Sequence, residues 1–441
     1  MKLKISYLRR ALSPLPLIIS LYAAPLTAFA DAPPEDHDMT PMSMSADGAM
    51  SHMMTGALGP YSMTRDASGT SWQPDSAIHG GLDVMEGDWM LMAHTLINGV
   101  YDWQQGPRGD HETFASGMIM FMASRHLASS DAVQFRAMLS PEPLMGKSGY
   151  PLLLATGETA NGATPLIDRQ HPHDLFMELS GTYSHALTAK DSAFLYVGLP
   201  GEPAFGPPAF MHRQSILDSP EAPISHHWLD STHITYGVAT AGFVQDNWKI
   251  EVSRFHGREP DEFRYDIETG PLDSTSARLS WNPTGEWSLQ LSWANQISPE
   301  QLEPDKNERR LSASAIYTRQ IAEHSWWSTT IAWGWRRNPG DQALNAYIVE
   351  SAYKPTDVWT VFGRAEREQN NELIALGPPP ADASAVSKVS IGAIRDFRLN
   401  AHVKVGVGAL YALNFVPGAL GSVYGRKDPQ GAMAFLRLKV D

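Results

Sequence analysis

From about residue 87 to the end of the chain, apolar side chains recur at every second position. The apolar residues that alternate with small or polar ones in the stretch 286–297 are Trp287, Leu289, Leu291 and Trp293. A period of two is typical of a β-strand with one apolar face. Many of these runs approach the ~9–11 residues that a strand needs to cross a membrane, whereas soluble sheets typically have strands of ~5–6 residues. The pattern favours strands that face lipid.

The alternating runs predict sixteen strands, an even number. They cover residues 88–103, 112–125, 132–140, 174–187, 192–199, 232–244, 247–256, 273–282, 286–297, 309–321, 324–337, 343–354, 357–369, 385–397, 402–415 and 430–440. Short turns and long loops alternate between them, with 338–342 as a short exception on the long-loop side. Outer-membrane barrels sort their connections in this way, but a soluble sandwich has no reason to do so.

The fold class predicted is therefore all-β, a transmembrane antiparallel β-barrel of about 16 strands, within a range of 14–18. A periplasmic β-propeller or sandwich is the alternative, but the chain shows no repeat at a blade-like period. After residue 30 no run approaches the ~18 apolar residues of a membrane helix.

Two segments precede the predicted barrel. Residues 1–30 have a basic start, an apolar run broken by prolines and a terminal A-F-A sequence, which together predict a signal peptide. Residues 31–86 have too few large aliphatic residues to fold alone, so we expect a flexible, Met/His-rich periplasmic segment. The barrel is expected over residues 87–441.

Composition excludes several function classes. The chain has 34 basic and 48 acidic residues, and removal of the signal peptide would make it more acidic still. Nucleic acid is therefore not an expected partner, because phosphate binding needs a basic surface. The chain has no cysteine, which rules out disulfides and thiolate ligands and leaves its 19 methionines and 16 histidines as ligands for a soft metal.

The first candidate metal ligands lie before the barrel. They are His37, Met39, Met42, Met44, Met50, His52, Met53 and Met54. Thioether sulfur suits Cu(I), and imidazole binds both copper states. Biased composition of a linker is the alternative explanation.

A second candidate group lies on the first two predicted strands, which should pair as a hairpin. If Trp89 and Ile119 face lipid, alternation turns the other face of each strand toward the lumen. The lumen-facing candidates are Met90, Met92, His94, Met118, Met120 and Met122. This row of soft ligands could pass a copper ion along the wall, or the methionines could simply fill gaps inside the barrel.

The third group lies in two long loops, 141–173 and 200–231, on the same side of the predicted barrel. Its candidate metal ligands are His171, His173, Asp174, His212, His226 and His227. Imidazoles with carboxylates nearby can bind Zn(II) or Cu(II). Lining of a pore without metal is the alternative. The proline-rich segment 200–210 predicts a stiff, extended path suited to folding across the pore.

Catalytic motifs are absent from the sequence. It has no Gly-x-Ser-x-Gly, no Walker-type phosphate loop and no dinucleotide fingerprint. We therefore do not expect an enzyme and predict no catalytic residues. A metal-dependent or serine hydrolase remains the alternative, because triad residues need not be close in sequence.

The signal peptide, the Met/His-rich lead-in and the alternating strands resemble the outer-membrane barrel proteins that accompany copper resistance in Gram-negative bacteria. The residues that carry the resemblance are those from His37 to Met54 given above. In that family a Met/His-rich segment precedes a barrel thought to sequester or move copper. This chain departs from the pattern in its short Met-rich segment, which lacks tandem repeats.

The resemblance implies an outer-membrane barrel that binds or passes copper, or another soft transition metal, and contributes to metal tolerance. A porin-like channel for small solutes and an outer-membrane hydrolase are the alternatives. The expected location is the outer membrane, with lipid, metal ions or small solutes, and periplasmic copper proteins as partners.

Overall fold

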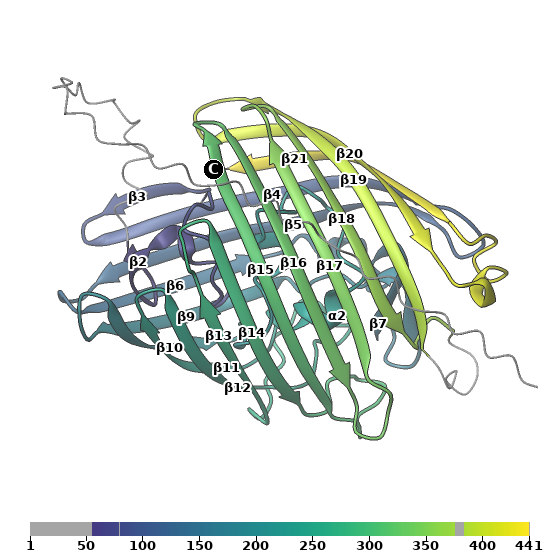
Figure 1. Cartoon of the computed structure of the whole chain (residues 1–441), viewed down its shortest axis with the longest axis horizontal. Coiled ribbons are helices and arrows are strands. Elements are labelled where there is room, and N and C mark those ends of the chain that lie inside the picture. The colour runs from purple at the N-terminus through teal and green to yellow at the C-terminus, as the bar shows by residue number, and fades with distance from the viewer. Residues whose placement is uncertain (1–54, 79, 375–382, 441) are drawn as a thin grey trace, which may run out of the picture. The chain divides into compact units, whose positions relative to one another are not determined.

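The computed structural model describes residues 55–78, 80–374 and 383–440. Every described residue belongs to one compact unit. Within the described residues, sixteen antiparallel strands from β4 to β21 close into a barrel (Figure 1). The predicted fold class and strand number are confirmed.

Each strand of the barrel pairs with its neighbours along the chain, apart from the inserted pair β7–β8. The strands are β4 (Trp89–Gln104), β5 (His111–His126), β6 (Asp131–Leu139), β9 (Phe176–Ala186), β10 (Asp191–Gly198), β11 (Val238–Gln245), β12 (Trp248–Phe255), β13 (Ser274–Trp281), β14 (Trp287–Gln296), β15 (Glu308–Ala322), β16 (Ser325–Arg337), β17 (Leu344–Lys354), β18 (Trp359–Asn370), β19 (Ser384–Arg398), β20 (Val403–Phe415) and β21 (Gln430–Val440). Pairing of β21 with β4 closes the barrel, and the short strand β3 (Leu82–Glu86) pairs with the start of β4, beyond the residues of β4 that pair with β21.

The alternation seen in the sequence separates an outer from an inner face. On the outer face, large apolar side chains such as Ile331, Ile391 and Leu436 are more than half exposed in the isolated chain, as expected for residues that contact lipid. Aromatic side chains gather near the short turns, where Trp248 stacks on Trp281 at 4.8 Å between ring centroids. Such rings mark the membrane interface of outer-membrane barrels.

One predicted strand begins later than expected. The run 232–244 forms a strand only from Val238, because Ser231–His233 form a 3-10 helix (η4) and Thr235 bridges to Gly201. Residues 232–236 are buried inside the barrel. The alternating apolar residues Ile234 and Tyr236 are therefore buried in the lumen, and the sequence pattern alone cannot distinguish this from a strand.

Two long connections fold into the lumen. The first contains the hairpin of β7 (Tyr150–Thr159) and β8 (Pro165–Gln170). The second, residues 199–237, is called the inner loop here; it contains η3 (Phe210–His212), α2 (His226–Leu229) and η4. Its segment 200–210 is buried throughout, but it bends at Ala204 and at residues 206–208, so the extended path that its prolines predict is interrupted.

Buried ion pairs hold the inner loop to the barrel wall. Arg213 donates to Glu350 of β17 at 2.7 and 2.8 Å and to Asp230 at 2.5 Å. Farther along the wall, Arg437 pairs with Asp218 of the inner loop. A buried charge without a partner is costly, so these pairs fix the position of the inner loop strongly.

The second half of the expected flexible segment 31–86 differs from that prediction. Residues 55–78, called the N-terminal insert here, form β1 (Thr55–Gly56), β2 (Gly59–Ser62) and η1 (Met63–Arg65), and β3 continues to residue 86. Leu58, Tyr61 and Trp72 of the insert form an apolar cluster with lumen-facing residues of β10 and β11. The segment as a whole has few large apolar residues, but these three side chains bury enough apolar area to give it an ordered structure.

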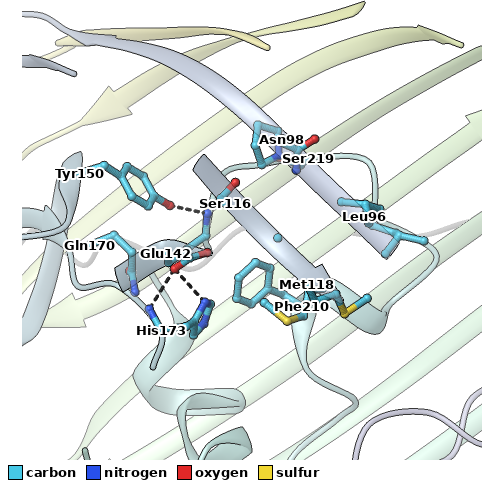
Figure 2. Close-up of a pocket in the computed structure, with 15 residues that line it drawn as sticks. Leu96, Asn98, Ser116, Met118, Glu142, Tyr150, Gln170, His173, Phe210 and Ser219 are labelled. Carbon is cyan, nitrogen blue, oxygen red and sulfur yellow. Dashed lines mark hydrogen bonds and ion pairs between the residues drawn. The ribbon is translucent and has the colours of Figure 1, made fainter. Parts of the chain in front are cut away.

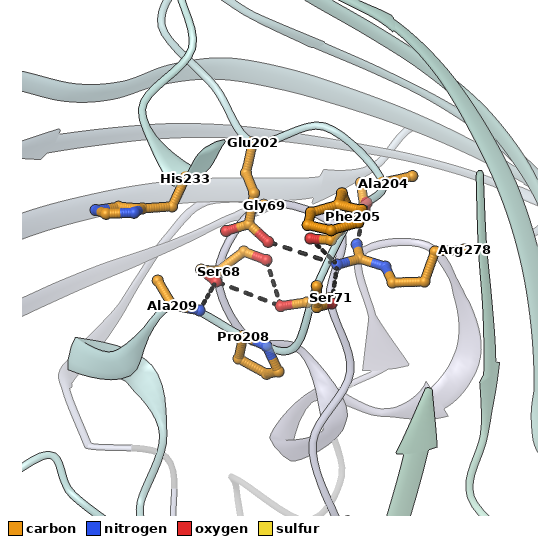
Figure 3. Close-up of polar contacts among 12 residues, drawn as sticks. Ser68, Gly69, Ser71, Glu202, Ala204, Phe205, Pro208, Ala209, His233 and Arg278 are labelled. Carbon is orange, nitrogen blue, oxygen red and sulfur yellow. Dashed lines mark hydrogen bonds and ion pairs between the residues drawn. The ribbon is translucent and has the colours of Figure 1, made fainter. Parts of the chain in front are cut away.

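Polar contacts join the N-terminal insert to the inner loop (Figure 3). The backbone N–H of Ala209 donates to Ser68 at 2.8 Å. Arg278 of β13 reaches both segments, because its guanidinium donates to Thr70 at 3.0 Å and lies 3.6 Å from the carboxylate of Glu202. The N-terminal insert and the inner loop therefore contact each other and the wall inside the lumen.

Among the residues that the structure describes, no helix has the length and apolar character needed to cross a bilayer.

Candidate functional site

The candidate ligands from His37 to Met54 lie outside the described residues. The lumen-facing row on β4 and β5 is present in the expected hairpin register: Met92 is opposite Met122, and His94 is opposite Met120. All of these side chains are buried in the barrel interior.

The structure adds methionines that the sequence pattern did not single out. Together the buried methionines form the methionine cluster: Met63, Met90, Met92, Met118, Met120, Met122, Met138 and Met177, with the partly buried Met211 against them. They come from four wall strands, the N-terminal insert and η3. Alternation on β6 and β9 could have found Met138 and Met177, whereas Met63 and Met211 are brought in only by the segments inside the lumen.

Two small cavities follow the methionine cluster. One, of about 70 Å³, is lined by Met120, Met122 and His94 together with Met118 and Met211. The other, of about 30 Å³, shares Met118 and Met211 and extends to His173 (Figure 2). Thioether groups therefore line a discontinuous path that ends at a histidine.

That histidine belongs to a group of imidazoles from both long connections. His173 follows β8, His226 lies in α2, and His233 lies in η4. One ring nitrogen from each of these three histidines lies within 4.8 Å of the others. We call this group the three-histidine site.

The Nδ1 of each ring of the three-histidine site faces an oxygen atom, through a hydrogen bond at His226 and His233 and through an ion-pair contact at His173. The Nδ1 of His173 lies 2.9 Å from Glu142, and the Nδ1 of His226 lies 2.8 Å from the Asp230 carboxylate. The Nδ1 of His233 lies 2.7 Å from the carbonyl oxygen of Asp230. An oxygen acceptor at Nδ1 places the proton there and leaves the lone pair on Nε2. Metal-binding histidines are oriented in this way.

At two of the three rings, the second nitrogen lacks a hydrogen-bond partner within the described residues. The Nε2 atoms of His173 and His233 are buried and make no hydrogen bond there. Buried polar atoms of native proteins are nearly always hydrogen-bonded, so an exception needs an explanation such as an ion or water. Three imidazoles that each bring one ring nitrogen to the same place are what a transition-metal ion needs.

Electrostatics favour the neutral ligand form at two of the three rings. Burial lowers the pKa of His226, and burial together with the neighbouring His173 and His226 rings lowers the pKa of His233 further. At His173, burial acts in the same direction, but the Glu142 carboxylate outweighs it and the pKa is raised. Proton competition for a metal is therefore strongest at His173.

The remaining predicted residues of this group lie elsewhere. Asp174 accepts a hydrogen bond from Tyr236 at 2.7 Å and lies 3.4 Å from Arg264, so it supports the loop structure. His212 lines the cavity of about 70 Å³ with the methionines. His171 and His227 are near the three-histidine site, with ring centroids 6.3 and 5.7 Å from that of His226.

Sequence reasoning missed the residues that orient the rings. His233 and Asp230 were visible in the same His/Asp-rich stretch, and the spacing of His226 and Asp230 is that of neighbours on one helical turn. Glu142 carries no comparable signal, because η2 (Glu142–Met145) lies far from His173 in sequence.

Comparison with known proteins supports the fold. No model of a known protein family matches the sequence, and no curated protein matches it. OmpF of Salmonella typhi, solved in a complex with daunomycin, is similar over 81% of this chain and 100% of its own, with a TM-score of 0.51 and 10% identity. The anion-selective porin of Comamonas acidovorans is similar over 80% of this chain and 100% of its own, with a TM-score of 0.48 and 9% identity. OprB of Pseudomonas putida covers 79% of this chain and 94% of its own at a TM-score of 0.48 and 10% identity.

The described residues thus form an outer-membrane β-barrel with a porin-like fold, and the protein is located in the outer membrane. At this level of identity the likeness concerns the fold alone.

Proposed function

We propose that the protein is an outer-membrane channel that binds copper inside its lumen, or another soft transition metal, and contributes to metal tolerance. The observation that carries the proposal is the three-histidine site, in which one nitrogen from each of three oriented, buried imidazoles lies within 4.8 Å of the others. Imidazole suits copper and zinc.

The methionine cluster supports copper in particular. Thioether sulfur is a soft ligand that selects Cu(I) over Zn(II) and hard cations. The cluster adjoins the three-histidine site through the cavity that Met118, Met211 and His173 line. A Cu(I) ion moving between the cluster and the histidines would meet a suitable ligand at each step.

The residues before residue 55 suggest how the protein could exchange copper with the periplasm. Six methionines occur within residues 39–54, beside His37 and His52. We propose that this segment exchanges copper with periplasmic copper proteins. Deletion of residues 37–54 should reduce growth under copper stress, and unchanged tolerance would remove this part of the proposal.

Metal analysis of the purified barrel tests the central claim. The variant His226→Ala/His233→Ala should bind copper at least about 100-fold more weakly than the wild type, since loss of even an orienting residue typically costs 10–100-fold. His111→Ala is the matched control, because the His111 side chain is 71% exposed. Equal copper affinity of wild type and double variant would overturn the proposal.

A channel for small solutes without a metal role is the second candidate, and the porin-like fold favours it. Conductance in planar bilayers separates the two. If conductance is insensitive to copper and to substitution of Met90 and Met120, the methionines only pack, and the solute channel is the better description.

A further inference from the structure

A large cavity opens among the long loops, outside the three-histidine site. It has a volume of about 620 Å³ and is formed by residues near 157–165, 300–308, 336–344 and 371–374, and by Ala383. Its acidic lining residues are Glu158, Glu300, Glu303, Glu308, Asp341 and Glu372, and its basic ones are Lys306, Arg336 and Arg337. An acidic cavity concentrates cations from the surrounding solution.

Three metal-ligating side chains meet beside this cavity. His227, Glu259 and Glu300 each offer one donor atom, and these atoms lie within 4.8 Å of one another. Glu300 is half-buried and lines the cavity, whereas His227 and Glu259 are buried behind it.

Two of these side chains carry buried polar atoms without hydrogen bonds. Within the described part of the chain, neither ring nitrogen of His227 has a hydrogen-bond partner, and the same is true of Oε2 of Glu259. The Nδ1 of His227 lies 3.8 Å from the other carboxylate oxygen of Glu259, Oε1, which is too long for a hydrogen bond. An ion bound by a ring nitrogen of His227 and by Oε2 of Glu259 would satisfy both groups.

The backbone at Gly157 leaves room for the His227 ring. Gly157 has φ +111°, and a Cβ there would lie 2.5 Å from Nε2 of His227. Any other residue would displace the ring. The imidazole therefore lies directly against a residue of the cavity wall.

The nearby guanidinium groups are already compensated by carboxylates. Arg336 donates to Glu372 at 2.7 Å, and Arg310 pairs with Glu308. Arg310 also donates to Oε1 of Glu259 at 3.2 Å, which leaves Oε2 available. Repulsion of a cation by these arginines is reduced accordingly.

We propose that His227, Glu259 and Glu300 form a second cation site, which captures a divalent transition-metal ion such as Zn²⁺ from the cavity at the long-loop end. One imidazole and two carboxylates suit Zn(II) and Cu(II), whereas the thioethers of the methionine cluster suit Cu(I). The role as a capture site rests on the proposed function, since the ring centroid of His227 lies 5.7 Å from that of His226 in the three-histidine site.

Zn²⁺ binding by the full chain in detergent tests this site, with the variant His226→Ala/His233→Ala as background. Equilibrium dialysis with metal analysis should show that adding Glu300→Gln to this background removes one Zn²⁺ per chain, and adding His227→Ala should do the same. Glu303→Gln is the matched control, because Glu303 lines the same cavity and is paired with Lys306. Glutamine preserves the shape of Glu300, and heat-modifiable migration on gels checks that each variant is folded.

The outcomes separate this inference from the proposed function. If Glu300→Gln and His227→Ala leave the Zn²⁺ content of the background unchanged, the second site is wrong, whatever the three-histidine site does. If the background binds as much Zn²⁺ as the wild type but Glu300→Gln removes one equivalent, the three-histidine site is wrong and the second site stands.

Discussion

The two ends of the lumen present different chemistry to an ion. Toward the short turns, which face the periplasm in outer-membrane barrels, the wall and the N-terminal insert present thioether groups from the methionine cluster. Toward the long loops, the lumen presents imidazoles and then carboxylates. Ligand softness therefore decreases from the periplasmic end to the outer end.

The two regions also differ in what holds them. Most of the methionine cluster lies on barrel strands, whose hydrogen-bonded ladders fix its geometry. The three-histidine site lies on segments inside the lumen and depends on side-chain contacts such as that between Arg213 and Asp230. Loss of one such contact should therefore disturb the three-histidine site and leave the methionine cluster unchanged.

The largest effect is expected from Arg213→Ala, which separates the two regions. The substitution would leave Glu350 and Asp230 buried without their cation, and breaking a buried pair in this way costs about 3–5 kcal/mol. We expect faster protease cleavage within residues 199–237 and a higher conductance, with an unchanged β-sheet signal in circular dichroism.

Arg319→Ala is the control for that experiment, since the Arg319 side chain is 62% exposed. If Arg213→Ala has the same protease resistance and conductance as the wild type, the inner loop does not depend on these ion pairs.

A smaller effect, confined to one metal, is expected from Met118→Leu/Met120→Leu. Leucine nearly preserves the volume but removes the sulfur, so Cu(I) affinity should fall about tenfold while Zn²⁺ affinity stays unchanged. Competition with a Cu(I) chelator under reducing conditions measures the change. Met433→Leu is the matched control, because Met433 is buried in a different apolar cluster. Equal losses for both metals would mean that the substitution acts through packing.

The smallest effect is expected from Glu142→Gln, on the pH dependence of metal binding. The Glu142 carboxylate raises the pKa of His173, so protonation of this ring competes with a metal as the pH falls. Glutamine still offers an oxygen to Nδ1 but carries no charge. The pKa of His173 should then fall, and the midpoint of metal binding should move to lower pH by about one unit.

Zn²⁺ titrations at several pH values measure this shift, with the exposed Glu286→Gln as the control. A midpoint that moves to higher pH would contradict the role assigned to Glu142.

The sequence predicted the barrel in some detail because lipid and lumen impose a period of two on every strand. The start of β11 was misplaced, since residues 232–237 belong to the inner loop, and its buried Ile234 and Tyr236 alternate as they would in a strand. The ordered structure of residues 55–78 was not predicted, because Tyr61 and Trp72 pack against residues of the barrel wall, which lie outside their own segment.

Part of the candidate site was also predictable. The pairing of β4 with β5 follows from their adjacency in the sequence, so the neighbourhood of Met92 and Met122 could be anticipated. The same reasoning placed two His-rich loops at one end of the barrel. It could not show that His173, His226 and His233 converge or that Asp174 binds Arg264 instead, because loop conformation depends on distant ion pairs.

What the sequence by itself determined is the barrel, its strand number and the side chains that face the lumen. Strands pair with their neighbours along the chain, and every second residue of a strand faces lipid and is therefore apolar. What only the tertiary structure decided is the filling of the lumen and the convergence of the metal-ligating groups. Those features depend on contacts between segments far apart in the chain, such as Arg213 with Glu350 and His173 with Glu142, which leave no periodic trace in the sequence.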